Sequence, residues 1–165
     1  MNAELVRANL EAIRAVAGSA VTIVTATKYV PLEDMALLAE AGVDVVGENR
    51  AQDLLAKHAA YGTAFRWHFI GHLQSNKVRV VNGICELVHS LDSDSAAARL
   101  TVPALLEVNL SGEGSKSGIP PHEIGPFLAR HPGVVCGLMT MPPLADDAEA
   151  SRPWFRRLRS LAEEH

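Results

Sequence analysis

The chain has 165 residues, of which 48% are hydrophobic and 21% charged, and this size and composition suit one soluble globular domain over residues 1–165. A formal net charge of −4 gives no basic footprint for nucleic acid, and no apolar run approaches the roughly 20 residues that a membrane span needs. The amino-terminal segment lacks the order of a signal peptide, and two isolated cysteines, Cys85 and Cys136, indicate a reducing compartment, so we expect a cytoplasmic protein.

Helices and strands are predicted to alternate from the start of the chain. Residues 2–17 place apolar side chains at helical spacing. A β-branched run over residues 21–26 predicts a buried strand. Residues 31–42 predict a second helix, with a proline in its first turn and a glycine at its end. A second strand is predicted over residues 43–47.

The same alternation continues to the last residue. Further strands are predicted at 65–70, 87–90, 105–109 and 134–139, and further helices at 49–60, 74–82, 121–130 and 146–165. Strands that alternate with helices favour an α/β fold with a parallel sheet, either closed into a barrel or open and doubly wound.

Two features favour a TIM-type (β/α)₈ barrel over the open sheet. The sequence has no glycine-rich dinucleotide fingerprint, and polar residues stand at or just beyond the ends of the predicted strands, where such a barrel builds its site. These are Lys28, Asn49, His72, Ser90, Asn109 and Thr140.

The length of the chain is short for a closed barrel. Such a barrel takes about 250 residues and eight strands, whereas six strands are predicted here. The connection between Ser90 and Leu105 is also tight, because a parallel crossover needs about a dozen residues. We therefore expect a barrel whose last strands are missing from residues 1–165, with further residues near position 100 and after His165. The alternative is a reduced chain with an open sheet edge, which would be prone to aggregate.

Five segments carry a resemblance to a known family. They are ATKYVP (26–31), VVGENRAQDLLAK (45–57), WHFIGHLQSNK (67–77), LLEVNLSGEGSKSGI (105–119) and GLMTMPP (137–143). Together, in this order, they resemble the pyridoxal 5′-phosphate (PLP) homeostasis protein family, whose fold is similar to the N-terminal barrel of alanine racemase. The resemblance covers nearly all of the chain.

The resemblance implies a function and a set of site residues. It implies a protein that binds PLP as a Schiff base on Lys28 and takes part in intracellular PLP homeostasis without evident catalysis, as a monomer that can supply apo PLP-dependent enzymes. It also implies that Asn49, His68, Gln74 and Lys116 line or flank the pocket and that Met139 closes one wall. The family continues beyond the last helix into a phosphate-binding loop and a strand with an arginine at the pyridine nitrogen, and residues 1–165 contain neither.

The residues themselves leave alternatives open. Lys28 directly follows an apolar strand, and partial desolvation at a barrel mouth would lower its pKa and activate its amine, but a solvated loop lysine fits the spacing too. Asn49 can contact the cofactor or cap the following helix. His68 and His72 are four residues apart, as in a helical metal pair, but here a strand ends between them.

The glycine-rich segment 111–118 also has two interpretations. It resembles a phosphate-binding loop, but Ser115 stands where the Walker pattern needs its second glycine. A lid that brings Lys116 to an anionic ligand, or a solvated turn, fits better. For the whole chain, the alternative function is a PLP-dependent enzyme similar to an amino-acid racemase, which would need acid and base groups on both faces of its substrate.

Overall fold

A single parallel sheet organises the chain in the computed structural model, which describes residues 2–165. Its strands are hydrogen-bonded in the order in which they occur in the sequence. The strands are β1 (Val24–Ala26), β2 (Val45–Glu48), β3 (Arg66–Phe69), β4 (Leu87–Leu91), β5 (Ala104–Glu107) and β6 (Val135–Met139). All five strand pairs are parallel. This confirms the six predicted strands and their parallel arrangement.

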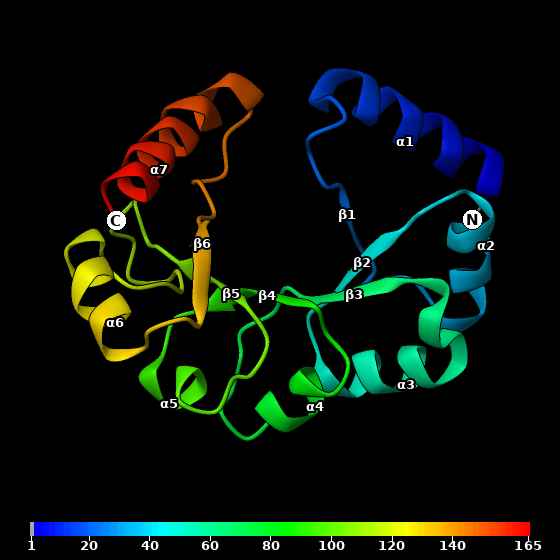
Figure 1. Cartoon of the computed structure of the whole chain (residues 1–165). Helices are drawn as coiled ribbons and strands as arrows, with labels where there is room; N and C mark the ends of the chain where they lie inside the picture. Colours follow the sequence, from blue (N-terminus) through cyan, green and yellow to red (C-terminus); the bar gives the residue numbers. More distant parts are fainter. Residues whose placement is uncertain (1) are drawn as a thin grey trace.

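Helices cover the convex side of the curved sheet, with α1 and α7 at the two ends of the arc (Figure 1). The α-helices are α1 (Ala3–Ala17), α2 (Met35–Glu40), α3 (Ala51–Tyr61), α4 (Val78–Asn82), α5 (Asp94–Ala97), α6 (Ile124–Arg130) and α7 (Arg152–Glu164). Short 3₁₀ helices are η1 (Leu32–Asp34), η2 (Gly62–Ala64), η3 (Pro121–Glu123) and η4 (Ala148–Ser151). Among the described residues, no helix combines the length and apolar character of a membrane span.

The hydrophobic core lies between the sheet and the helices. Side chains alternate between the two faces of a strand, so Trp67 and Phe69 of β3 share the face that packs in this core, and each is 2% exposed. Leu54 of α3 and Phe127 of α6 bury their side chains in the same cluster. Burial of one such side chain contributes about 1.5–3 kcal/mol to stability. The core between sheet and helices therefore stabilises the strand register, and this register also sets the positions of the side chains on the opposite face of the sheet.

The sheet is open within the described residues, because β1 and β6 each pair with one neighbour. The agreement between predicted and observed strand boundaries differs at the two edges. The predicted first strand begins too early, since Val21 is 54% exposed and pairing starts only at Val24. At the other edge, β6 matches the predicted strand to within one residue.

The connection from β4 to β5 needs no further residues near position 100. Residues 92–103 include α5, a helix of one turn that the sequence analysis missed, and they return the chain to a parallel strand. The register between these strands shifts between Val88 and Leu91. A short helix and a local irregularity thus make this crossover within the residues present.

The two cysteines should differ sharply in reactivity. Cys85 is 5% exposed and its burial raises the pKa of its thiol to about 12, whereas Cys136 is exposed. Because the thiolate is the reactive form, we expect iodoacetamide to label the folded protein once, at Cys136, and the urea-unfolded protein twice. Intact mass and a peptide map measure this, and equal labelling of both thiols in the folded protein would contradict the burial of Cys85.

Candidate functional site

The carboxyl ends of the six strands form one rim of the sheet, because all the strands point the same way. Lys28 follows β1, Asn49 follows β2, and Met139 ends β6. The register pairs Ala26 with Gly47. Lys28 and Asn49 each follow this last pair by two residues.

Lys28 lies in an exposed turn at this rim. Its ammonium is 4.9 Å from the centre of the Tyr29 ring, and the residue lines a cavity of about 350 Å³ whose far wall includes Asp53 and Ala56 of α3. Within the described residues Lys28 is exposed, so the desolvation expected at a barrel mouth is not found there.

Asn49 does not cap the helix that follows it. Arg50 occupies the N-cap position of α3 and makes no side-chain cap, and within residues 2–165 the Asn49 amide makes no hydrogen bond. A Cβ atom at Gly71 would collide with the Asn49 carbonyl, so only glycine allows the loops after β2 and β3 to meet. The capping interpretation is therefore wrong, and the half-buried amide remains available to a ligand.

Directly beneath these two residues lies a buried polar cluster of Thr27, Glu48 and Lys57, hereafter the Lys57 cluster. Lys57 Nζ, from α3, donates to the Thr27 carbonyl at 2.8 Å and to Glu48 Oε1 at 2.5 Å. The Thr27 hydroxyl donates to the same carboxylate oxygen at 2.6 Å. Thr27 and Glu48 are fully buried, and Lys57 is 6% exposed. The cluster joins the ends of β1 and β2 to α3.

Glu48 is only half satisfied by this cluster. Its second oxygen, Oε2, is buried and has no hydrogen-bond partner among the described residues. Desolvation of a carboxylate costs free energy that a single ion pair does not fully offset. The Lys57 cluster therefore fixes the ends of β1 and β2 relative to α3, and it does so at a cost in folding free energy.

His68 points away from the core, on the other face of β3 from Trp67 and Phe69. Its Nδ1 is 2.9 Å from Nε2 of His89, which comes from β4. Burial, together with the neighbouring His89, lowers the pKa of His68 to about 4, and burial also lowers the pKa of His89. Both rings are thus neutral at neutral pH, and one nitrogen of the close pair carries the shared proton.

His68 and His72 do not converge. His72 Nδ1 lies 3.5 Å from Asp92 Oδ2, whereas His68 contacts His89. Across residues 2–165, no group of three His, Cys, Asp or Glu side chains is arranged to hold a metal ion. Gln74 is exposed in the loop after β3.

Lys116 and Met139 belong to the other half of the rim. Lys116 Nζ lies 3.1 Å from Glu113 Oε1 and donates to the Met141 carbonyl at 3.3 Å. It lines a cavity of about 550 Å³ with Glu107, whose carboxyl pKa is raised mainly by burial. Met139 is the register partner of Glu107. The predicted site residues therefore share one rim but not one cavity.

The segment 111–118 forms a braced turn. The Asn109 amide donates to the Glu113 carbonyl at 2.9 Å, and its oxygen accepts from the Gly112 N–H at 3.0 Å. Gly118 has a φ of 102°, and a Cβ there would meet the Asn109 nitrogen at 2.9 Å. The next helix, η3, starts only at Pro121, so no helix N-terminus directly follows the loop as a Walker motif requires.

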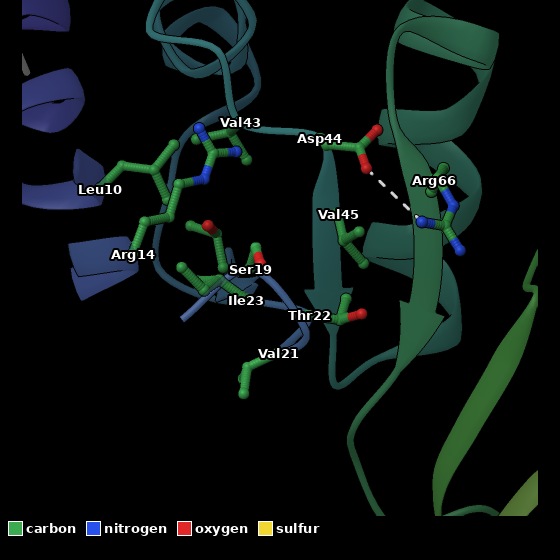
Figure 2. Close-up of a pocket in the computed structure, with 11 residues that line it drawn as sticks. Leu10, Arg14, Ser19, Val21, Thr22, Ile23, Val43, Asp44, Val45 and Arg66 are labelled. Atoms are coloured by element: carbon green, nitrogen blue, oxygen red, sulfur yellow. Dashed lines mark hydrogen bonds and ion pairs between the residues drawn. The ribbon is translucent and has the colours of Figure 1, made fainter. Parts of the chain in front are cut away.

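The opposite end of the sheet holds a separate polar cavity of about 230 Å³ (Figure 2). Arg66 on its wall already pairs with Asp44 at 3.5 Å and with Glu86 at 2.8 Å. The cavity shares no lining residue with the rim. None of the predicted site residues lines this cavity.

Comparison with known proteins agrees with this architecture. The chain matches the family described as alanine racemase, N-terminal domain, over residues 1–165. It is 40% identical to the pyridoxal phosphate homeostasis protein of Aquifex aeolicus, over 84% of this chain and 67% of that protein. Identity to the protein of the same name from Vibrio cholerae is 32%, over 99% of this chain and 78% of that one.

The chain belongs to the pyridoxal phosphate homeostasis protein family. Among solved structures it is similar to PipY of Synechococcus elongatus with PLP bound, with a TM-score of 0.86 and 27% identity over 96% of this chain and 81% of that one. Alanine racemase from Corynebacterium glutamicum shares the fold, with a TM-score of 0.69 and 13% identity over 100% of this chain and 52% of that one. The TIM-barrel type predicted from the sequence is thereby confirmed.

Removal of Lys57 alone should be far more costly than removal of its whole ion pair. Lys57→Met strands the Glu48 carboxylate in the core, and we expect it to lower the free energy of unfolding by about 3–5 kcal/mol. Lys57→Met with Glu48→Gln removes both charges and should recover about 2 kcal/mol or more of that loss. Urea unfolding followed by circular dichroism measures all four members of the cycle. Additive losses would show that the two charges are not coupled.

The neutral His68 should make stability depend on pH. Between about pH 6.5 and about pH 4 the unfolded chain binds a proton at His68 that the folded protein does not, so stability rises with pH across this window and is lost as pH falls. In His68→Gln the stability difference between about pH 7.5 and about pH 5 should shrink by about 2 kcal/mol. Urea unfolding at both pH values tests this. An unchanged difference would mean that His68 titrates normally in the folded state.

Proposed function

We propose that this chain binds PLP reversibly through a Schiff base on Lys28 and acts in the cytoplasm as a non-catalytic carrier in PLP homeostasis. The observation that carries the proposal is the placement of an exposed lysine, Lys28, and an amide without a hydrogen bond among the described residues, Asn49, just beyond neighbouring strands at the carboxyl rim of the sheet. The proposal is supported by the similarity to PipY, whose solved structure holds PLP.

The chemistry suits the position of Lys28. Its unprotonated amine attacks the aldehyde carbon, a C=N bond forms, and the aldehyde oxygen leaves as water. Since the turn at Lys28 is open to solvent, water can also return to the C=N carbon and release PLP. A carrier needs both formation and hydrolysis of the C=N bond, whereas an enzyme that retains its cofactor benefits from a site closed to water.

The remaining predicted residues would contact the bound ring. The free Asn49 amide can donate to and accept from its polar substituents. His68, neutral because of its low pKa, would add no charge beside the ring. Lys116 would approach an anionic group from the far side of the rim, and Met139 would form an apolar wall.

A carrier is favoured over a racemase-like enzyme. Racemisation needs acid and base groups on both faces of the substrate carbon. The likeness to alanine racemase, at 13% identity, extends to the fold alone. The relatives at 32–40% identity are homeostasis proteins. Apo PLP-dependent enzymes are the partners that this role would serve.

Borohydride trapping tests the proposal. PLP is added, sodium borohydride reduces any C=N bond to a stable secondary amine, and intact mass with a peptide map locates the adduct. We expect one phosphopyridoxyl group on Lys28. In Lys28→Ala the signal should fall about tenfold or more, since the remaining lysines lack a comparable position.

Lys77→Met is the matched control, because this half-exposed lysine lies outside the proposed site. It should trap PLP like the unaltered protein. Trapping spread evenly over all lysines, or undiminished in Lys28→Ala, would refute the proposal. Racemisation of an amino acid by the loaded protein would favour the enzyme instead.

A further inference from the structure

We propose that Lys57 is a positioning residue for the PLP site: its buried ammonium ties together the strand ends from which Lys28 and Asn49 project. The inference rests on the proposed function and adds to it a nearly buried residue whose ammonium is bound by Thr27 and Glu48, at the base of the cavity that Lys28 lines. It follows from where the two acceptors of Lys57 stand in the chain.

Each acceptor belongs to the residue immediately before a predicted site residue. The Thr27 carbonyl, 2.8 Å from Lys57 Nζ, is part of the peptide bond that leads into Lys28. The carboxylate of Glu48, 2.5 Å away, is on the residue before Asn49. A single ammonium therefore restrains both turns.

Backbone pairing alone does not extend this far. The ladder between β1 and β2 ends with the Thr27 N–H donating to the Gly47 carbonyl at 2.9 Å. The next residue, Lys28, already lies in the turn closed by the Val30 N–H and the Thr27 carbonyl at 2.8 Å. The Thr27 carbonyl therefore receives two donors, one from the turn and one from Lys57, and this fixes the orientation of the peptide that carries Lys28.

The burial of the cluster argues against a role in stability alone. Lys57 occupies the buried face of α3 together with Ala51 and Leu54, where an apolar side chain would pack without desolvation cost. The unpaired Oε2 of Glu48 adds to that cost. In some proteins a buried ion pair is retained for the geometry that it specifies, and the contacts of Lys57 with two strand ends fit that role.

The test compares the unaltered chain with the Lys57→Met/Glu48→Gln double variant, which leaves no stranded charge. Amide hydrogen exchange of the peptides around residues 26–31 and 47–50, measured without PLP, reports the restraint directly. We expect exchange there to rise about tenfold or more in the double variant while the core strand β3 stays protected. Lys77→Met should leave both regions unchanged.

The second readout is the initial rate of borohydride-trapped adduct on Lys28 across a pH series. A misplaced amine reacts more slowly although its ionisation is unaltered, so we expect the rate to fall about 10- to 100-fold at every pH, with the shape of the pH profile preserved. Lys57→Arg, which keeps a buried cation and donors, should restore part of the rate. It also serves as the comparison if the double variant unfolds.

The outcomes separate the two proposals. Adduct formation in the double variant at the unaltered rate, or unchanged exchange around Lys28, overturns the positioning role while the PLP function stands. Absence of a Lys28 adduct in the unaltered chain overturns the PLP function, and the role of Lys57 toward PLP with it. Slower trapping together with faster exchange supports both.

Discussion

Parallel hydrogen bonding between consecutive strands obliges every connection to carry the chain back to the same end of the sheet. This constraint gathers the residues that follow β1, β2 and β6 at one rim, although more than a hundred residues separate Lys28 from Met139. Helices pack on the convex side, so the apolar layer forms there and the rim remains free for polar side chains (Figure 1). The position of the candidate site is thus a consequence of strand direction.

Periodicity and glycine or proline boundaries were sufficient to predict the strands and most helices, because most elements direct apolar side chains from one face toward the core. The β3 strand shows why, since Trp67 and Phe69 alternate with Arg66 and His68. The prediction failed at places without such a face. Val21 is β-branched but has no partner strand beside it, and α5 is too short to show a helical period.

The site was predictable only in part, and for a related reason. Family motifs predicted Lys28, Asn49 and His68 as site residues, but not the residues that contact the strand ends around them. Lys57 follows Ala51 and Leu54 at intervals of three on α3, a spacing that places it on the buried face although lysine is usually exposed. The contact of His68 with His89 depends on the register between β3 and β4, and this register cannot be determined from the sequence pattern.

Under the proposed function, Lys28 and Lys57 divide two tasks between them: one reacts and the other restrains the backbone. An amine that is to exchange repeatedly between water and an aldehyde must meet solvent, and Lys28 does. A solvated side chain, however, cannot hold its own backbone, because water competes for every hydrogen bond that it makes. In the low dielectric of the interior the same ammonium group binds its acceptors strongly. Lys57 occupies that environment and binds the carbonyl of Thr27, the residue before Lys28, so in this proposal the tip of Lys28 stays mobile while its backbone is held.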